Sequence, residues 1–538
     1  MDKKQLLLAQ SPHSAVGADL RFGENTTSFP LSLPVPHREC ILVKIFGFFT
    51  VRYLSSHQTS LGTMRFTIYQ AIGLLSLVSV SLSRSLPEKR QTSVAAWVST
   101  EQNIALSSLF RNIGSSGEFA KSADPGAVIA SPSTSSPDYY YQWTRDSAMV
   151  FKVLLNQYIN GNSSLETMLK EYATESAKLQ KTSNPSGSYT TGGIGEPKFY
   201  VNGAAFTGGW GRPQLDGPAI RATVLTKFAN MLLDAGETSY VTSTLYDSAF
   251  PTNSVIKADL EYVANYWTNS GFDLWEEVNG QHFFTYIVQY RALVEGAELA
   301  NRLGDTGAGT YYTTQAAAIK AKLPSFWSSS KGYLLATLNT GRTGLDCGTL
   351  LGSLHGNGAR GFNVYPASSP EVLATVKALV DSMKTLYAIN TASGAPGVAI
   401  GRYPEDVYDG VGTSTANPWF ICTLTTAEVL FTAAKEFTAA GSITVTSVNQ
   451  AFLQQFKSSA SSGTTYAAGS TDFTSIIAAI NTYADTFVAT AQLHAASNGS
   501  LSEQFSRTDG SQKGARDLTW SYASFLTTAA ARAGTIAF

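Results

Sequence analysis

The sequence predicts an all-α fold for residues 91–538. Apolar side chains recur at every third or fourth position, as at Ile220, Val224 and Phe228, before Gly236 ends the segment; this spacing marks one face of an α-helix. Strand-like alternation is scarce, and long loops rich in Trp, Gly, Arg and Asp separate the helical segments. Loops of that length within one domain are usually functional. These observations suggest pairs of helices arranged in a ring, with an active site at one end.

The individual helices are placed by the same criterion. Val150, Leu154 and Tyr158 form a stripe that ends at Gly161, and another stripe starts at Phe420. No Pro-rich or Ser/Thr-rich linker interrupts the region, so we interpret it as one domain. In chain order, the predicted helices span residues 97–113, 144–160, 165–180, 217–234, 253–268, 281–302, 307–324, 368–387, 418–437, 444–457, 471–490 and 516–533.

The first ninety residues follow a different pattern. Met64 is followed by Arg65 and a mostly apolar run that ends near Leu82, and Lys89-Arg90 is a dibasic site. This is the layout of a secretory signal, and the apolar run is short for a membrane span. We therefore predict a secreted, extracellular protein. Its predicted parts are a spurious or alternative upstream extension at 1–63, a signal peptide with a dibasic pro-segment at 64–90, and the mature chain at 91–538.

Secretion gives meaning to the sequons and to the cysteines. Asn162-Ser-Ser and Asn498-Gly-Ser are candidate sites of N-glycosylation. Cys347 and Cys422 are the two cysteines of the predicted mature chain. They could form one disulfide, but Cys422 lies in an apolar helical run, where a buried free thiol is an equally good interpretation.

The composition argues against several classes of function. The chain has 38 basic and 39 acidic residues, a balance that does not suit a nucleic-acid-binding surface. It contains no CxxC or HExxH motif and no glycine-rich phosphate-binding loop, so we expect neither a metal ion nor a cofactor. The many aromatic residues suit neutral polar ligands such as sugars, whose C–H faces stack on rings. We expect a monomer that binds neither nucleic acid nor a membrane.

One loop concentrates negative charge. The segment SGFDLWEEVNG, residues 270–280, places Asp273, Glu276 and Glu277 beside Trp275, although the net charge of the whole chain is only −1. Neighbouring carboxylates repel one another. Taken alone, the segment fits an exposed acidic turn before a helix as well as it fits an active site. The choice between these two interpretations therefore depends on the other loops.

Four further loops carry unusual motifs: YYYQWTRDS at 139–147, GGWGRPQLDGP at 208–218, GRYPEDVYDG…NPW at 401–419 and SNGSLSEQFSRTDG at 497–510. Together with DLWEEVNG, in this order and helical setting, they closely resemble the catalytic domain of the secreted fungal glucoamylases of glycoside hydrolase family 15. The resemblance covers essentially all of 91–538 and implies an (α/α)6 barrel, a six-hairpin toroid with long active-site loops. It also implies inverting, exo-acting hydrolysis that releases β-D-glucose from the non-reducing ends of α-1,4-glucans such as starch and maltooligosaccharides, more slowly at α-1,6 links.

The resemblance assigns roles to three carboxylates. Inversion needs one carboxyl that protonates the leaving oxygen and a second, roughly 6.5–9.5 Å away, that activates water. Glu276 is similar to the general acid of the family, which has to hold its proton, and apolar Trp275 and the charge of Glu277 favour that form. Glu503 of LSEQF matches the general base. Asp273 resembles an auxiliary residue near the acid, with proton acceptor as its alternative role.

The remaining motif residues are expected to bind sugar. By similarity, Arg145, Asp146 and Arg402 grip hydroxyls of the terminal glucose, because charged groups make strong hydrogen bonds. Trp210 is expected to close over the substrate, and Glu277 to hydrogen-bond the leaving glucose. The other expected substrate-binding residues are Tyr139, Trp143, Arg212, Trp275, Trp419, Gln504 and Trp520.

The chain also departs from its relatives. Many of them have several disulfides and, after the catalytic domain, a Ser/Thr-rich linker with a starch-binding domain. Here the sequence ends eighteen residues after Trp520, so we expect no starch-binding domain.

Three other interpretations stay open on the sequence. Another exo-acting hydrolase on the same barrel, such as a glucodextranase or a trehalase-like enzyme, would differ in substrate and product. A non-catalytic glycan-binding protein would not need both Glu276 and Glu503. A cell-wall structural protein would need repeats or a lipid-anchor signal, and the sequence shows neither.

Overall fold

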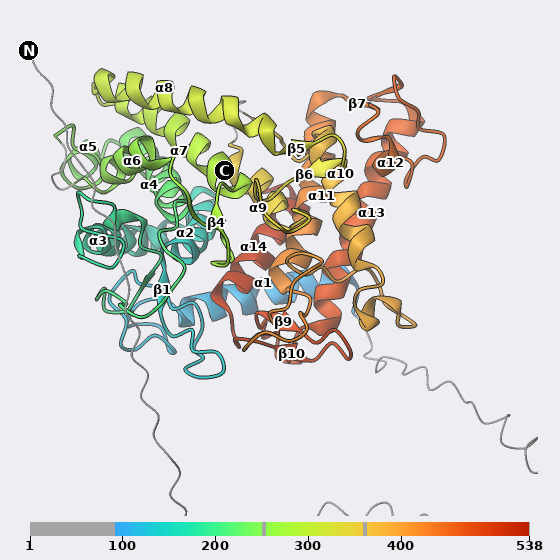
Figure 1. The fold of residues 1–538 in the computed structure, drawn as a ribbon, viewed down its shortest axis with the longest axis horizontal. Helices are drawn as coiled ribbons and strands as arrows, with labels where there is room; N and C mark the ends of the chain where they lie inside the picture. The colour runs from blue at the N-terminus through green and yellow to red at the C-terminus, as the bar shows by residue number, and fades with distance from the viewer. Residues whose placement is uncertain (1–91, 250–253, 359–362, 537) are drawn as a thin grey trace, which may run out of the picture. The chain divides into compact units, whose positions relative to one another are not determined.

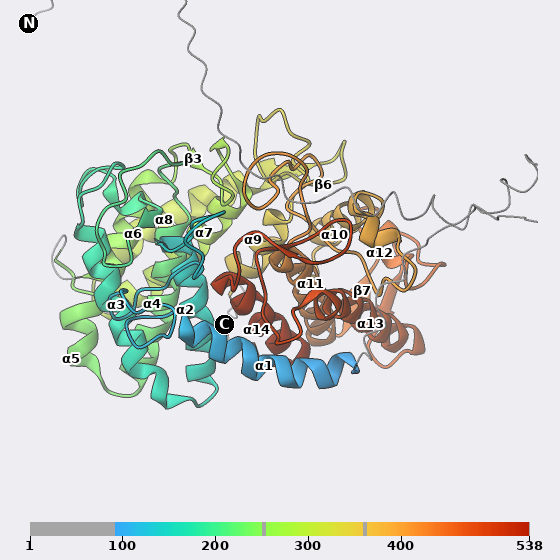
Figure 2. The same ribbon diagram turned by 90° about the horizontal axis from the view of Figure 1, so that it is seen from below.

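In the computed structural model, which describes residues 92–249, 254–358, 363–536 and 538, six helices with nearly all-round burial form an inner ring. Such burial is typical of helices at the centre of a large domain. Each of the six contacts the next, and the last, α14, contacts the first, α2, which closes the ring (Figures 1 and 2). They are α2 (Thr144–Ile159), α4 (Gly217–Asp234), α7 (Phe283–Arg302), α9 (Gly348–Gly356), α11 (Phe420–Ala440) and α14 (Thr519–Ala533).

Six other helices surround this ring. Each buries one side and leaves residues on the other side exposed, as an amphipathic surface helix does. Along the chain, outer and inner helices alternate, so that each pair forms a hairpin of an (α/α)6 barrel, as predicted. The outer helices are α1 (Val94–Arg111), α3 (Glu166–Lys181), α6 (Val255–Tyr266), α8 (Thr306–Lys322), α10 (Pro370–Met383) and α13 (Thr471–His494).

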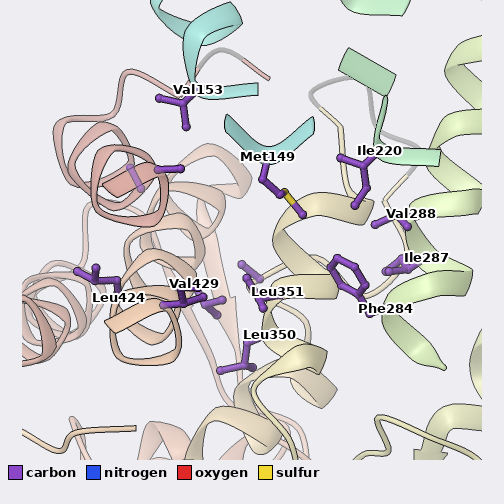
Figure 3. Close-up of a cluster of buried hydrophobic side chains, with 14 of the residues drawn as sticks. Met149, Val153, Ile220, Phe284, Ile287, Val288, Leu350, Leu351, Leu424 and Val429 are labelled. Atoms are coloured by element: carbon purple, nitrogen blue, oxygen red, sulfur yellow. The ribbon is translucent and has the colours of Figure 1, made fainter. Parts of the chain in front are cut away.

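Apolar side chains of the inner helices fill the space inside the ring. Met149 of α2, Ile220 of α4 and Leu351 of α9 approach one another there, and α7 and α11 contribute further side chains (Figure 3). Because this core is packed, the ring is not an open channel.

The remaining elements are short. Five two-stranded antiparallel sheets lie in the loops: β1 (Gln142–Trp143) with β2 (Lys198–Phe199), β3 (Gly271–Phe272) with β4 (Asn279–Gly280), β5 (Trp327–Ser328) with β6 (Tyr333–Leu334), β7 (Ser442–Thr444) with β8 (Thr465–Ala467), and β9 (Gln504–Phe505) with β10 (Gln512–Lys513). The short helices are α5 (Thr238–Tyr240) and α12 (Gln450–Leu453), 3₁₀ turns at Ser163–Leu165, Gly193–Gly195, Leu323–Phe326 and Ala388–Thr391, and a π turn at Val241–Leu245.

Two of the helix assignments from sequence were wrong. Of the helix predicted at 444–457, only the four-residue α12 forms, and strands β7 and β8 precede and follow it in the sequence. The inner helix α9, GTLLGSLHG, was missed because its glycines disfavour a helix. In the structure these glycines have a packing role: a Cβ on Gly352 would lie 2.9 Å from Phe283, and one on Gly356 would lie 2.4 Å from Ile287. They allow α9 to pack closely against α7.

In the predicted order of helices, four of the five motif-bearing loops follow an odd-numbered helix, and the loop at 401–419 does not. The missed helix α9 explains this exception. With α9 included, all five motif-bearing loops connect an outer helix to the following inner helix, and such connections meet at one end of the barrel. The sixth connection of this kind, residues 323–347 between α8 and α9, carried no motif that the sequence analysis used.

The predicted upstream extension at 1–63 and the predicted signal and pro-segment at 64–90 lie outside the described residues. Within the described ranges, no helix combines the length and the apolar character needed to cross a membrane.

The two cysteines are joined. Cys347, next to the start of α9, forms a disulfide with Cys422 in the first turn of α11, with 5.8 Å between their Cα atoms. Of the two interpretations open on the sequence, the disulfide is therefore the one observed. It ties two neighbouring inner helices together close to the loop end of the barrel.

Candidate active site

A cavity of about 300 Å³ lies at the end of the barrel where the outer-to-inner connections meet. All five motif-bearing loops contribute to it. Twelve of the predicted site residues line it: Tyr139, Trp143, Arg145, Asp146, Trp210, Trp275, Glu276, Glu277, Arg402, Trp419, Glu503 and Trp520.

The loop between α6 and α7 presents Glu276 to the cavity in an unusual backbone conformation. Glu276 has φ +69°, in the left-handed region that non-glycine residues rarely adopt. The turn is held by Asp273, whose Oδ1 accepts the backbone N–H groups of Glu277 at 2.7 Å and Val278 at 2.8 Å. Backbone strain of this kind concentrates at functional sites, where the surrounding structure enforces it.

Three side chains surround the Glu276 carboxylate. Its Oε1 accepts a hydrogen bond from the Trp143 indole at 2.7 Å and one from the Gln214 amide at 3.1 Å. The Arg145 guanidinium lies 3.6 Å away. The carboxylate is therefore fixed in direction before any substrate binds, which is a requirement for proton transfer at a defined atom.

The neighbours that were expected to keep Glu276 protonated are directed elsewhere. The Trp275 indole donates to both carboxylate oxygens of Asp346, at 3.0 and 3.1 Å. Glu277 forms its own ion pairs, so its charge is compensated. Neither Trp275 nor Glu277 therefore acts on the Glu276 carboxyl in the way that was expected from the sequence.

Glu277 belongs to a second charged group, centred on Arg402. It accepts hydrogen bonds from Arg402 at 2.8 Å, Arg342 at 2.8 Å and the Tyr403 hydroxyl at 2.5 Å. Burial raises the pKa of Glu277, but these three groups outweigh burial and lower the pKa below its usual value. The carboxylate is thus ionised and occupied by protein donors.

Arg402 is held rigidly by Asp406 in the same loop. Its Nε and one terminal nitrogen donate to the two carboxylate oxygens of Asp406 at 2.7 and 2.6 Å, the bidentate arrangement that suits a guanidinium. The rings of Trp275 and Trp419 lie 5.4 and 5.3 Å from its guanidinium carbon. Arg402 therefore presents a fixed cation to the cavity.

Arg145 and Asp146 lie in the first turn of helix α2, and both are buried residues of the cavity wall. Arg145 donates to Gln214 at 2.7 Å and to Asp216 at 3.0 Å. The Asp146 carboxylate lies 3.8 Å from the Nε of Arg145. Burial raises the pKa of Asp146 to about 7, although the Arg145 charge lowers it. Asp146 thus offers an acceptor, or a donor when protonated, to a ligand in the cavity.

Glu503 lies in a drier environment, in the loop between α13 and α14. The residue is 1% exposed, and burial raises the pKa of its carboxyl to about 8. A hydrogen bond from the Tyr139 hydroxyl and the charge of Arg402 act in the opposite direction and lower that pKa. Gly514 packs directly on the carboxylate, because a Cβ there would lie 2.3 Å from Glu503 Oε2.

Three predicted residues support the cavity without lining it. Asp273 holds the Glu276 turn. Arg212 braces the loop of Trp210 through Glu196 at 3.0 Å and the Gly208 carbonyl at 2.9 Å. Gln504 is buried behind Glu503, where its Oε1 accepts the Asn417 amide at 3.0 Å. Direct contact with sugar is thus not indicated for these three.

Several residues that shape the site were not among those predicted from the sequence. Tyr408 lines the cavity, and its hydroxyl pairs with that of Tyr139 at 2.9 Å. Tyr408 and Asp406 belong to the 401–419 motif and Gln214 to the 208–218 motif, so these three residues could have been identified from the motifs. Asp346 had no such signal, because its partner Trp275 lies in a different loop.

The two predicted glycosylation sites differ in exposure. Asn498 is exposed in the loop that also carries Glu503, and Asn162 is half-buried just after α2. Glycosylation of either residue stays a prediction.

Comparison with known proteins agrees with this architecture. Residues 103–530 match the sequence profile of the glycosyl hydrolases family 15. Glucoamylase-1 of Schizophyllum commune is 42% identical over 471 residues, which are 86% of this chain and 79% of that protein. The probable glucoamylase of Schizosaccharomyces pombe is 41% identical over 82% of this chain and 92% of its own length.

Solved structures show the same fold. The family 15 glucoamylase of Hypocrea jecorina superposes with a TM-score of 0.77 at 44% identity, over 82% of this chain and 73% of that one. The glucoamylase of Saccharomycopsis fibuligera gives a TM-score of 0.76 at 34% identity, over 85% of this chain and 99% of that one. The profile match and the relatives each span most of the chain, and the predicted fold class is confirmed. The chain therefore belongs to the glycosyl hydrolases of family 15.

Proposed function

We propose that this chain is a secreted glucoamylase that hydrolyses α-1,4-glucans from their non-reducing ends with inversion and releases β-D-glucose. Membership of the family makes it a glycoside hydrolase, and the relatives described above are named glucoamylases. Starch and maltooligosaccharides are the proposed substrates, with slower cleavage of α-1,6 links.

The observation that carries the proposal is the position of two carboxyls in one cavity. Glu276 precedes α7 and Glu503 precedes α14, and both line the cavity. In the inner ring these helices stand three places apart out of six, so their loops approach the cavity from opposite sides. Inversion requires this arrangement, because the acid and the water-activating base act on opposite faces of the sugar.

In the proposed reaction, Glu276 donates its proton to the glycosidic oxygen as the bond to the anomeric carbon breaks. Glu503 accepts a proton from the water that attacks that carbon from the other face. Trp143 and Gln214 direct the Glu276 carboxyl, and Tyr139 together with Arg402 stabilises the ionised form of Glu503. Positioned acid–base catalysis contributes about 10²–10⁴-fold to such reactions.

The shape of the cavity supports attack at chain ends. Arg145 and Asp146 line it from the first turn of α2, and further along the same helix Met149 joins the packed core (Figure 3). A glucan therefore has no exit below the cavity and enters only with an end. Arg145, Asp146 and Arg402 are proposed to bind the hydroxyls of that terminal glucose.

The decisive experiment follows hydrolysis of maltoheptaose by NMR. We expect maltohexaose and glucose as the first products, with glucose appearing as the β-anomer. Initial α-glucose would contradict inversion, and early short oligosaccharides would contradict exo action. Parallel assays with dextran and trehalose test the rival specificities.

Secretion, glycosylation and a monomeric state are part of the proposal and rest on the sequence. N-terminal sequencing of protein from the culture medium is expected to begin near Gln91, and a first residue upstream of Met64 would contradict the predicted signal. Mass loss on deglycosylation tests Asn162 and Asn498, and light scattering tests the monomer.

A further inference from the structure

The connection between α8 and α9, residues 323–347, sends one buried carboxylate to the loop of Glu276. Asp346 is 5% exposed, and its two carboxylate oxygens lie 3.0 and 3.1 Å from the indole nitrogen of Trp275, whose N–H they accept. Trp275 immediately precedes Glu276 in the chain. The proposed reaction gives Asp346 no role, although this bond ends one residue from the general acid.

Asp346 is itself held in place by α9 and α11. Its Oδ1 also accepts the backbone N–H of Gly348, the first residue of α9, at 2.6 Å. The next residue, Cys347, forms the disulfide with α11, and its N–H donates to the Arg402 carbonyl at 2.8 Å. Burial raises the pKa of Asp346 to about 7, and the N–H groups of Gly348 and Trp275 act against burial because they stabilise the ionised form. The carboxylate is therefore a fixed acceptor for the indole.

The hydrogen bond to Asp346 selects one orientation of the Trp275 side chain. Trp275 is 7% exposed, and its ring lies 5.6 Å from the ring of Trp419 and 5.4 Å from the guanidinium carbon of Arg402. A buried indole N–H that loses its acceptor is strongly unfavourable. The ring therefore stays where its N–H reaches Asp346.

The backbone of the Glu276 turn is thus fixed on both sides of its strained residue. After Glu276, the carboxylate of Asp273 accepts the next two backbone N–H groups. Before it, Asp346 fixes the side chain of Trp275. The φ of +69° at Glu276 is unfavourable for a residue with a Cβ and persists only where the surroundings enforce it. Release of Trp275 would let this backbone relax and carry the Glu276 carboxyl away from the donors that direct it.

We propose that Asp346 is a positioning residue for the general acid. Through the indole N–H of Trp275, it keeps the Glu276 turn in the conformation that delivers a proton to the glycosidic oxygen. This inference rests on the proposed function and concerns its acid step. Asp346 lies behind the cavity wall and is not among the residues that line the cavity. Its effect is therefore confined to reactions that need the acid.

The test compares two substrates that differ in this need. Maltose requires a proton on the oxygen of its leaving sugar, whereas α-glucosyl fluoride releases fluoride without one. In Asp346→Ala, kcat on maltose should fall about 10- to 100-fold, because a reacting group misplaced by about 1 Å costs up to roughly 10²-fold, and kcat on the fluoride should fall by less than about 3-fold. A purely structural role would lower kcat equally on both substrates. That result, or no loss on either substrate, would overturn the proposal.

Two further variants make the result specific to the hydrogen bond. Asp346→Asn keeps the Oδ1 acceptor that serves both Gly348 and Trp275, and it should recover most of the kcat on maltose. Trp275→Phe removes the same hydrogen bond but keeps the Asp346 carboxylate, so it should show the same difference between substrates even if Asp346→Ala does not fold. Equal losses in Asp346→Asn and Asp346→Ala, or no difference between substrates in Trp275→Phe, would contradict action through this bond.

Gln315→Ala is the matched control. Gln315 of α8 accepts the indole N–H of another buried tryptophan, Trp267, at 2.8 Å, and neither residue is among those that line the cavity. This variant should unfold at a lower temperature and keep its kcat on both substrates. A selective loss on maltose in Gln315→Ala would show that any weakened tryptophan has this effect, and would overturn the role of Asp346.

Glu276→Gln, assayed in parallel, separates this inference from the proposed function. It should lose activity on maltose and keep much of it on the fluoride. If Glu276→Gln does not distinguish the two substrates, the assignment of the acid in the proposed function is wrong. If Glu276→Gln distinguishes them and Asp346→Ala does not, the proposed function stands and the positioning role of Asp346 is wrong.

Discussion

The two carboxyls of the cavity stand in opposite kinds of surroundings. Glu276 is held by hydrogen-bond donors and lies 3.6 Å from the Arg145 guanidinium, and its side chain is 18% exposed. Glu503 is almost completely buried, and burial raises its pKa to about 8. The cavity wall around Glu276 is thus polar and hydrogen-bonded, and the wall around Glu503 is shielded from water.

The difference suggests that the base function proposed for Glu503 depends on the neighbours of this residue. Burial favours the neutral carboxyl, whereas a general base has to be ionised. Tyr139 and Arg402 lower the pKa of Glu503 and so favour the ionised form. On the Glu276 side, by contrast, the partners mainly fix orientation. Removing groups from each wall should therefore have distinct effects.

The largest expected effect comes from the carboxyls themselves. Glu276→Gln and Glu503→Gln should each lower kcat on maltoheptaose by at least about 10²-fold, because each removes one proton transfer. α-Glucosyl fluoride separates the two roles, since fluoride leaves without help from an acid. Glu276→Gln should keep much of its activity on the fluoride and Glu503→Gln should not. The reverse result would exchange the two assignments.

A smaller loss of kcat is expected when a methyl group is added next to Glu503. A Cβ at Gly514 would lie 2.3 Å from Glu503 Oε2, so Gly514→Ala displaces the carboxylate. Misplacement of a reacting group by about 1 Å costs up to roughly 10²-fold in rate, and we expect a fall in kcat of about 10-fold or more.

Gly441→Ala is the control for this variant. Gly441 has the same φ of +67° as Gly514 but nothing within 4 Å of its Cβ position. It should lose some stability and keep its kcat. Similar kcat losses in both variants would show that backbone strain, not contact with Glu503, is responsible.

A third variant changes the pH dependence. Tyr139→Phe removes the hydrogen bond that lowers the pKa of Glu503, so that pKa rises. The base then needs a higher pH to ionise, and the acid limb of the kcat/KM profile moves to higher pH, while the rate on the plateau changes only a few-fold. A limb that stays in place, or moves to lower pH, would contradict the role of Tyr139.

The smallest effect on activity is expected from the disulfide. The disulfide between Cys347 and Cys422 links α9 to α11, and the two cysteines are 75 positions apart in the sequence. Disulfides typically contribute about 2–4 kcal/mol to stability. The double variant Cys347→Ala/Cys422→Ala should unfold at a lower temperature and keep its kcat at 25 °C. Unchanged thermal stability would show that the bond contributes nothing, and treatment of the unaltered protein with a reductant is the control.

Local sequence patterns were sufficient to predict most of the helices, and the resemblance to the family singled out the two central carboxyls. Inner helices such as α2 and α11 are apolar over long stretches, and this pattern needs no tertiary information. Glu276 and Glu503 stand in motifs whose residues are adjacent in sequence. The position of the five loops at one end followed from the alternation of helices, except where α9 was missed.

Other features depend on contacts between distant segments and could not be predicted. The glycines of α9 argue against a helix locally, and only their contact with α7 shows why they are tolerated. Asp346 contacts Trp275, which lies 71 positions away in the sequence. Lys198 contacts four rings from two connections, those before α2 and α4.

The sequence by itself thus determined the class of fold, the order of the loops and the chemical groups available to the site. The tertiary structure alone decided which of these groups form hydrogen bonds or ion pairs with one another and which are shielded from water. The physical reason is that hydrogen bonds, ion pairs and desolvation act over a few ångströms in space. Trp275 and Glu277 are adjacent to Glu276 in sequence, yet they bond to Asp346 and Arg402, while Trp143 and Gln214 from other loops hold the Glu276 carboxylate.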